Sequence, residues 1–175
     1  AVLVVKEGKI IAERYAAGFG PFKPQIGWSM TKSVLATWIG MLEHDGYLNV
    51  NDKAGLQVWN GDNRKDISID NLLRMSSGIE WDEVYSGPST ATDMLYGEPD
   101  MGLYFANQPL EFDIGTKWEY SSGTSNILSY ILKQRLKPED YYLYPYDSLF
   151  FPLGIRSALI ESDVSGTYVG SSYMW

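Results

Sequence analysis

The chain of 175 residues contains no cysteine and only one histidine, His44. Without cysteine there is no disulfide, no thiol nucleophile and no thiolate metal ligand. With a single histidine, we exclude a multi-histidine metal centre and a histidine-based catalytic triad. The lack of cysteine does not indicate a compartment, because many proteins of oxidising compartments also lack it. If the chain is a hydrolase, its general base is therefore not histidine.

Long apolar runs and clusters of basic residues are also absent. No run of 18 apolar residues occurs, and the apolar start AVLVV is too short for a membrane span or a signal peptide. The net charge of −8 argues against a nucleic-acid surface, which needs clustered Lys and Arg. The 45% of hydrophobic residues suffice for a buried core. The composition predicts a soluble globular protein with no nucleic-acid partner, and leaves periplasmic, secreted and cytoplasmic locations open.

One segment, 27–46 (GWSMTKSVLATWIGMLEHDG), joins an apolar helix to two chemically active groups. Its apolar residues recur at spacings of three and four, and Gly46 is placed to end the helix. In a helix that begins near Met30, Ser29 stands at the N-cap or N1. Lys32 then lies on the same face, with about 5 to 6 Å between the Cβ atoms. The amine can reach the hydroxyl, and the pair predicts a serine nucleophile with lysine as its base.

The Ser-x-x-Lys spacing alone has an ordinary alternative, a helix cap followed by a solvated lysine. A chain of this size contains about one such tetrapeptide by chance. However, Lys32 is the only charged residue between Lys23 and Glu43, which predicts that it is partly buried. Burial lowers the pKa of an amine, so a lysine at this position is suited to accept the Ser29 proton.

The remaining pattern predicts an α+β fold with a mostly helical insert. The runs AVLVVK and KIIAERYA, joined at Glu7-Gly8, are typical of a hairpin at the edge of a sheet. Short helical fragments and long loops follow, and a longer helix is expected at 122–136. SALIESD and GTYVGSS are predicted as short strands that return to the sheet. We expect an N-terminal part of the α/β domain at 1–46, a mostly helical domain at 47–155 and a truncated return at 156–175.

Four motifs together carry a family resemblance: Ser29-Met-Thr-Lys32, LLRMSSG (72–78), Tyr120-Ser-Ser122 and FPLG (151–154). In order and spacing they resemble the serine β-lactamase and penicillin-binding protein superfamily, on its class C-like side. SSGIEWDEVY (76–85) and the terminal GSSYMW are most similar to the branch of 6-aminohexanoate-dimer hydrolases and related carboxylesterases. The resemblance covers essentially the whole chain and implies an α/β sandwich of the β-lactamase type, an antiparallel sheet flanked by helices.

The resemblance also implies residue roles. Ser29 matches the nucleophile that accepts the acyl group, Lys32 the lysine that takes its proton, and Tyr120 the tyrosine that relays a proton to the leaving group. The Ser29 backbone N–H matches one of two oxyanion donors. Ser122 and, less directly, Tyr85 match substrate-binding positions, although an ordinary packed or surface tyrosine is the favoured explanation of Tyr85. No cofactor and no metal is implied.

Two departures from the family pattern affect the expected activity. The second motif is usually Tyr-x-Asn, and here Ser122 replaces the asparagine, which suits an esterase or unusual amidase better than an enzyme acting on β-lactams. The third motif, Lys-Thr-Gly or His-x-Gly on a C-terminal strand, is missing, and we do not assign it to Ser165-Gly166-Thr167. Other sheet strands are missing too, and an isolated hairpin is marginally stable. We therefore expect the remainder of a longer chain, or a complementary chain, to complete the sheet.

The sequence thus predicts a serine hydrolase that forms an acyl-enzyme on Ser29 and acts on a small ester or amide. The alternatives are a non-catalytic penicillin-binding or sensor domain, and a true β-lactamase or D-Ala-D-Ala peptidase. The identity of the substrate stays open. Other polar and aromatic clusters have structural explanations: a helix-end cation for His44, packing for the tyrosines at 141–146, and capping for Asp62, Asp66 and Asp70.

Overall fold

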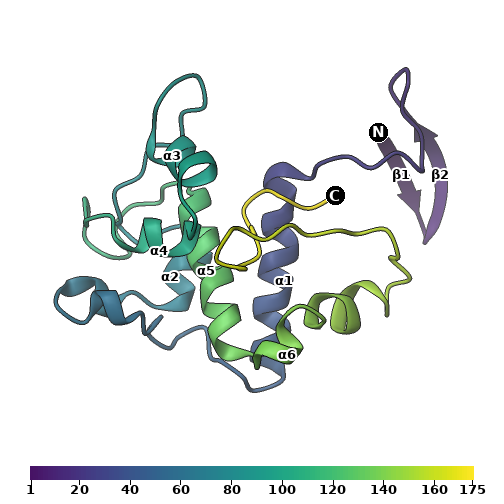
Figure 1. The fold of residues 1–175 in the computed structure, drawn as a ribbon. Helices are drawn as coiled ribbons and strands as arrows, with labels where there is room; N and C mark the ends of the chain where they lie inside the picture. The colour runs from purple at the N-terminus through teal and green to yellow at the C-terminus, as the bar shows by residue number, and fades with distance from the viewer.

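The computed structural model describes residues 1–175 and shows a body of helices from which a two-stranded hairpin projects (Figure 1). Strand β1 (Val2–Lys6) pairs antiparallel with β2 (Lys9–Arg14). At the turn, Glu7 and Gly8 have φ values of 49° and 73°, the left-handed conformation of a two-residue type I′ turn. The predicted hairpin, its turn and the mixed α and β character of the fold are confirmed.

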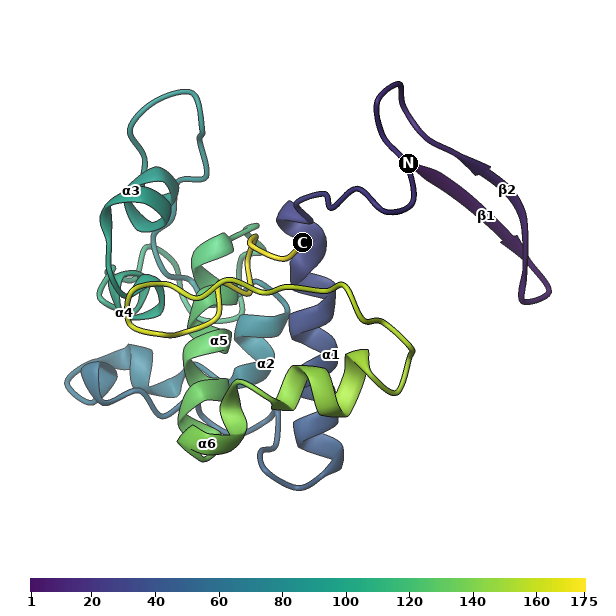
Figure 2. The same cartoon turned by 45° about the vertical axis from the view of Figure 1, so that its right-hand side comes forward.

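The hairpin packs against nothing on either face. All residues of both strands are exposed, and apolar ones are among the most open, with Val2 at 64% and Ile10 at 61%. In both views the hairpin lies away from the helices and is joined to them by an extended linker (Figures 1 and 2). Because antiparallel sheets ordinarily cover at least one face, both faces of this ribbon are open to further packing.

Helix α1 (Thr31–His44) is the predicted helix of segment 27–46. It buries Leu35, Trp38, Ile39 and Leu42 at 2% exposure or less, the i, i+3, i+4, i+7 pattern of one helix face. Asp45 caps the helix, and Gly46 follows it with a φ of 79°. The prediction that Gly46 ends the helix in a left-handed conformation is confirmed.

The entry to α1 differs from the prediction. A 3₁₀ turn, η1 (Trp28–Met30), precedes α1, so Ser29 lies one residue before the N-cap and the expected N-cap or N1 placement is wrong. The N-cap is Met30, whose side chain makes no capping hydrogen bond. The tighter turn compensates, because the backbone N–H of Thr31 bonds to the carbonyl of Trp28 within η1.

Helix α5 (Ser122–Arg135) crosses the centre of the body (Figure 1) and confirms the helix predicted at 122–136. The side chain of its N-cap, Ser121, accepts a hydrogen bond from the Thr124 N–H. Gly123 allows a close approach of α4, since a Cβ there would lie 2.4 Å from the Phe105 ring. The N-terminus of α5, which carries the Tyr120-Ser-Ser122 motif, is therefore held against the body.

Shorter elements complete the body. Ser68 begins α2 with a capping box, formed with Asn71. The shorter elements of the body are η2 (Gln57–Trp59), η3 (Asn63–Asp66), α2 (Ile69–Leu73), α3 (Thr90–Gly97), α4 (Met101–Ala106), α6 (Pro138–Tyr141) and the π-helical turn η4 (Tyr146–Phe150).

The C-terminal segment does not form the predicted strands. The β-bridges of residues 157–175 lie within the segment, between Ile160 and Met174 and between Ser162 and Tyr168. The sheet consists of β1 and β2 alone. The segment runs across α1 and α5 (Figure 2). The prediction that SALIESD and GTYVGSS return to the sheet is wrong.

A carboxylate explains why this segment folds back on the helices. Asp163 accepts hydrogen bonds from the backbone N–H groups of Met101 and Thr167 and from the Ser165 hydroxyl. Gly166, with a φ of 78°, makes the turn between the bridged residues. These bonds fix a loop on the helical body and leave no extended run of backbone for a sheet partner.

Helices α1 and α5 share one hydrophobic core with most of the shorter elements. The division of the chain at residues 46 and 155 stays a prediction. None of the helices combines the length and the apolar character that crossing a membrane requires.

Candidate active site

Ser29 is exposed and stands in η1, immediately ahead of the first turn of α1. Its neighbour Trp28 has a φ of 45°, a left-handed conformation that is uncommon for a bulky residue. The backbone of this turn is tied down, since the Gly27 N–H donates to the Met174 carbonyl at 2.6 Å. Backbone conformations of this kind are found preferentially at functional sites.

Lys32, on the first turn of α1, is half-buried and directs its amine at three oxygens. Its Nζ donates to Ser29 Oγ at 3.2 Å, to Ser122 Oγ at 3.0 Å and to the Ser171 carbonyl at 2.9 Å. Three oxygens therefore surround the amine, two of them besides Ser29 Oγ. The contact between amine and hydroxyl that the spacing predicted is present, and so is the predicted partial burial.

Tyr120 immediately precedes the N-terminus of α5 and contacts Lys32 through its ring. The Lys32 Nζ lies 5.0 Å from the ring centroid, within the range of a cation–π interaction. The Tyr120 side chain is 37% exposed. The structure thus brings the three residues predicted as catalytic, Ser29, Lys32 and Tyr120, to one place.

Ser122, on the first turn of α5, has no exposed surface. Its hydroxyl accepts from Lys32 Nζ and donates to Glu83 Oε1 at 2.7 Å, and its backbone N–H donates to Glu83 Oε2 at 2.7 Å. The structure gives this hydroxyl no open surface for the substrate contact predicted for it. Its contacts are with the lysine and with a carboxylate.

Glu83 is a site residue that the sequence interpretation missed. Its carboxylate accepts four hydrogen bonds: the two from Ser122, one from Trp81 Nε1 at 2.8 Å and one from the Tyr85 hydroxyl at 2.7 Å. The stretch WDEVY was noted for its resemblance, yet only its tyrosine was singled out. The two acidic residues within that stretch, Asp82 and Glu83, were the available signal.

Tyr85 lies beside this cluster, with 55% of its surface exposed. Partial burial, and then the hydrogen bond to the Glu83 carboxylate, raise the pKa of Tyr85 above its usual value. The hydroxyl is thus kept neutral and turned toward Glu83. The structure brings Tyr85 to the edge of the site without directing it at Ser29.

The C-terminal segment supplies the third acceptor for Lys32, which sequence reasoning also missed. The Ser171 N–H donates at 3.2 Å to Oδ1 of Asn126, a buried residue of α5, and this bond fixes the Ser171 carbonyl. Two residues on, the Tyr173 ring packs edge to face on Trp28 at 6.2 Å. Burial, together with Tyr96, raises the pKa of Tyr173 to about 12. A neutral aromatic pair therefore borders Ser29.

Comparison with known proteins identifies the family of this chain. A family model described as Beta-lactamase matches residues 1–174. The chain belongs to the beta-lactamase family. This membership confirms the predicted superfamily of serine β-lactamases and penicillin-binding proteins.

Individual members of this family and fold are similar over part of their length. The chain is 26% identical over 167 residues to a putative penicillin-binding protein, PbpX, of Bacillus subtilis, covering 89% of this chain and 40% of that protein. The solved structure of a putative 6-aminohexanoate-dimer hydrolase from Bacillus anthracis superposes with a TM-score of 0.80 at 16% identity, covering 98% of this chain and 49% of that one.

A D-amino acid amidase from Ochrobactrum anthropi, solved with D-phenylalanine, superposes with a TM-score of 0.54 at 17% identity. It covers 83% of this chain and 55% of the amidase. At such identities the two solved structures support the beta-lactamase-family fold alone. The chain spans about two fifths to just over half of the length of the proteins it matches.

The rejected third motif lies far from the candidate site of this beta-lactamase-family chain. The Ser165 carbonyl and the Thr167 hydroxyl accept hydrogen bonds from Lys133, near the C-terminal end of α5. Ser122 stands at the opposite end of that helix, about 16 Å away along its axis. Ser165-Gly166-Thr167 therefore does not contribute a strand beside Ser29.

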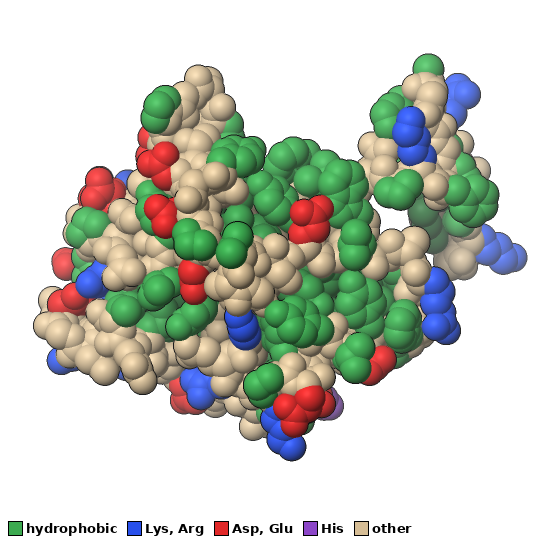
Figure 3. Space-filling model, in the orientation of Figure 1, with side chains coloured by type: hydrophobic (Ala, Val, Ile, Leu, Met, Phe, Trp, Pro, Cys, Tyr) green, Lys and Arg blue, Asp and Glu red, His purple; other side chains and the backbone are tan.

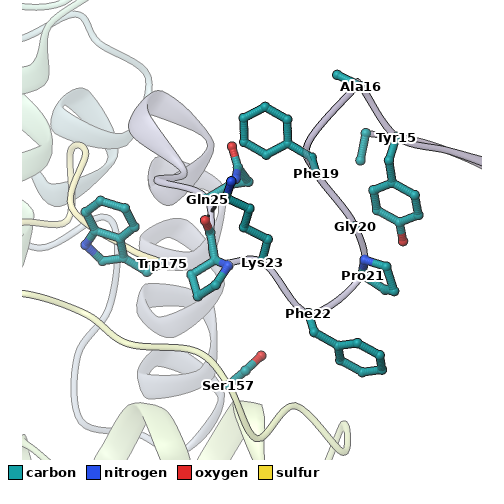
Figure 4. Close-up of a pocket in the computed structure, with 12 residues that line it drawn as sticks. Tyr15, Ala16, Phe19, Gly20, Pro21, Phe22, Lys23, Gln25, Ser157 and Trp175 are labelled. Carbon is teal, nitrogen blue, oxygen red and sulfur yellow. Dashed lines mark hydrogen bonds between the residues drawn. The ribbon is translucent and has the colours of Figure 1, made fainter.

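One cavity lies outside the candidate site, beside the linker that joins the hairpin to the helices. It has a volume of about 520 Å³ and is lined by the end of the hairpin, the linker at 15–25, Ser157 and Trp175 (Figure 4). None of the five residues predicted for the site lines it. On the same side of the body, apolar side chains gather over the N-terminus of α1 and the C-terminal segment (Figure 3), with Trp28 at 51% and Met30 at 70% exposure. An open apolar face therefore lies between the hairpin and the helices.

The remaining sequence candidates have structural partners. The Asp62 side chain caps η3 and pairs with Arg64, whose hydrogen bonds lower the pKa of Asp62 to about 2. Asp66 pairs with Lys53 and Asp70 with Arg74. His44 ends α1, and Tyr141 packs on Tyr168 at 5.1 Å between ring centroids. No cluster of three or more His, Cys, Asp or Glu side chains suited to a metal ion occurs.

Proposed function

We propose that this chain carries the nucleophile, base and proton relay of a serine hydrolase that acts on a small ester or amide through an acyl-enzyme. The observation that carries the proposal is the 3.2 Å contact between Lys32 Nζ and the exposed Ser29 Oγ, in a lysine held by two further acceptors. Proximity of base and nucleophile is the basic requirement of this chemistry.

In the proposed reaction, Ser29 Oγ attacks the substrate carbonyl carbon while its proton passes to Lys32 Nζ. The oxyanion that forms accepts a hydrogen bond from the Ser29 N–H, and one such donor contributes on the order of 10² to 10³ in rate. The bond to the leaving group then breaks, and the leaving oxygen or nitrogen takes up the proton through Tyr120. Water attacks the ester on Ser29 in a second step and releases the acid.

The names of similar proteins support the class of substrate. The D-amino acid amidase is named for an amide substrate, and the putative 6-aminohexanoate-dimer hydrolase for the hydrolysis of a small dimer. The name of the Bacillus subtilis relative, a penicillin-binding protein, instead favours a domain that is acylated by penicillin without turnover. Because Ser122 replaces the usual asparagine, we favour an ester or amide over a β-lactam.

Labelling of Ser29 tests the proposal and separates it from the sensor alternative. We expect a fluorophosphonate to form an adduct on Ser29 of the intact protein, and Ser29→Ala to abolish it. Ser33→Ala is the matched control, since Ser33 is an exposed serine on the first turn of α1, four residues after Ser29. Peptide mass spectrometry identifies the labelled residue. An intact protein with no adduct on Ser29 contradicts the enzyme, while a permanent penicillin adduct without ester turnover supports the sensor.

We further propose that additional strands complete the sheet around β1 and β2, supplied by the remainder of a longer polypeptide or by a complementary chain. The support is the exposed apolar hairpin and the open face between it and the helices. The missing oxyanion donor would come from such a strand. We expect the intact mass of the active protein from its native host to exceed 19.7 kDa. An active monomer of that mass contradicts this proposal.

A further inference from the structure

The Glu83 carboxylate is surrounded by two kinds of donor. The backbone N–H of Ser122 and the indole N–H of Trp81 meet Oε2, and both hydrogens have fixed directions. The hydroxyls of Ser122 and Tyr85 meet Oε1, and both hydrogens rotate about their C–O bonds. An ionised carboxylate only accepts hydrogen bonds, so it obliges both hydroxyls to donate to it.

This arrangement determines to which neighbour the Ser122 hydroxyl donates its hydrogen and from which it accepts one. Its single hydrogen is committed to Glu83 Oε1 at 2.7 Å, so only lone pairs remain for Lys32 Nζ at 3.0 Å. The Ser171 carbonyl, at 2.9 Å from Nζ, also only accepts. Two of the three neighbours of the amine are therefore obligate acceptors.

A neutral lysine has two N–H bonds and one lone pair. With both N–H bonds directed to Ser122 Oγ and the Ser171 carbonyl, the lone pair is left for the third neighbour, Ser29 Oγ. That is the orientation in which the amine accepts the Ser29 proton. The direction of the Lys32 lone pair thus depends on the Ser122 hydroxyl, which accepts from Lys32 because its hydrogen is donated to Glu83.

We propose that Glu83 is a positioning residue that holds the Ser122 hydroxyl as an acceptor and so aims the Lys32 lone pair at Ser29. This inference rests on the proposed function, because it concerns the efficiency of the proton transfer from Ser29. The Glu83 carboxylate bonds to Trp81, Tyr85 and Ser122 and makes no hydrogen bond to Ser29.

The variant Glu83→Gln reverses the direction of the hydrogen bond between residue 83 and the Ser122 hydroxyl, and the side chain keeps nearly the same shape. The amide oxygen takes the Oε2 side, where the fixed N–H donors point, and the NH₂ group faces the two hydroxyls. Ser122 Oγ then accepts from Gln and turns its hydrogen toward Lys32, where it occupies the lone pair. General acid–base catalysis contributes 10² to 10⁴ in rate, so we expect kcat for a p-nitrophenyl ester to fall about 100-fold. KM should change little, because no substrate contact is removed.

A second substitution makes this test specific. Ser122→Ala removes the hydroxyl whose direction matters, and with one N–H of Lys32 left without its acceptor we expect about a 10-fold loss of kcat. In the double variant, no hydroxyl is left to occupy the lone pair. Glu83→Gln with Ser122→Ala should therefore be about 10-fold faster than Glu83→Gln alone. A residue that merely supports the loop at 81–85 gives a double variant at least as slow as Glu83→Gln.

The matched control is Glu80→Gln, an exposed glutamate whose side chain makes no hydrogen bond, for which we expect unchanged kcat. All variants are made in the intact protein, and thermal unfolding checks their folding. Rates of fluorophosphonate labelling at Ser29 should follow the same order as kcat. If wild type is labelled and the double variant is not faster than Glu83→Gln, the positioning role is wrong and the hydrolase stands. If wild type is not labelled, both fail.

Discussion

Lys32→Ala is expected to abolish hydrolysis of p-nitrophenyl esters by the intact protein while leaving it folded. The amine is the only basic group in contact with Ser29 Oγ, and its loss removes proton transfer from the attack step. We expect kcat to fall on the order of 10³-fold. Initial rates measure the effect, and circular dichroism with thermal unfolding measures folding.

Lys32→Arg separates the charge of this residue from its basicity. Arginine keeps the positive charge but does not give up its proton in proteins, so we expect this variant to be as inactive as Lys32→Ala. Lys65→Ala, at an exposed lysine with no hydrogen bond or ion pair, is the control and should keep full activity. Retained activity in Lys32→Ala would mean that another group takes the Ser29 proton.

The local part of the candidate site was predictable from the sequence. Ser29 and Lys32 are three residues apart where η1 passes into α1, and this i, i+3 spacing on successive helical turns brings their side chains together. The same periodicity predicted the buried face of α1 and the range of α5. The one local error, Ser29 in a 3₁₀ turn rather than at the cap, came from a backbone detail, the left-handed φ of Trp28.

The long-range part was not predictable in this way. Glu83 meets Ser122 across 39 positions of sequence, and the Ser171 carbonyl meets Lys32 across 139. The periodicity of the sequence does not reveal such long-range contacts. Every residue has a backbone carbonyl, so the residue type at 171 does not indicate that this carbonyl contacts Lys32. Tyr85 was found through a resemblance, but the direction of its hydroxyl toward Glu83 required coordinates.

The strands predicted for the C-terminal segment failed for a related reason. SALIESD and GTYVGSS each contain a short apolar run that is compatible with a strand, yet such a run does not say what the backbone pairs with. The three hydrogen bonds accepted by the Asp163 carboxylate hold the segment as a loop on the helices. That loop in turn delivers the Ser171 carbonyl to Lys32.

Trp81 connects the hydrophobic core to the candidate site, and its substitution is expected to have the largest effect on stability. The ring is 7% exposed and packs edge to face on Phe105 at 4.9 Å, while its indole N–H donates to Glu83 Oε2. Trp81→Ala removes the ring and leaves a cavity, so we expect the free energy of unfolding to fall by about 3 to 5 kcal/mol. Urea denaturation of the intact protein measures it.

Two further variants divide this loss into packing and hydrogen bonding. Trp81→Phe keeps an aromatic ring against Phe105 but removes the donor to a charged acceptor, so we expect a smaller loss of about 1.5 to 3 kcal/mol. Trp118→Ala, at a tryptophan that is 67% exposed, should change stability by no more than about 0.5 kcal/mol. Equal losses for Trp81→Phe and Trp81→Ala would place the whole effect in the hydrogen bond to Glu83. A loss in Trp81→Phe no larger than that in Trp118→Ala would mean that the indole N–H does not hold Glu83 in place, and that the carboxylate is fixed by Ser122 and Tyr85 alone.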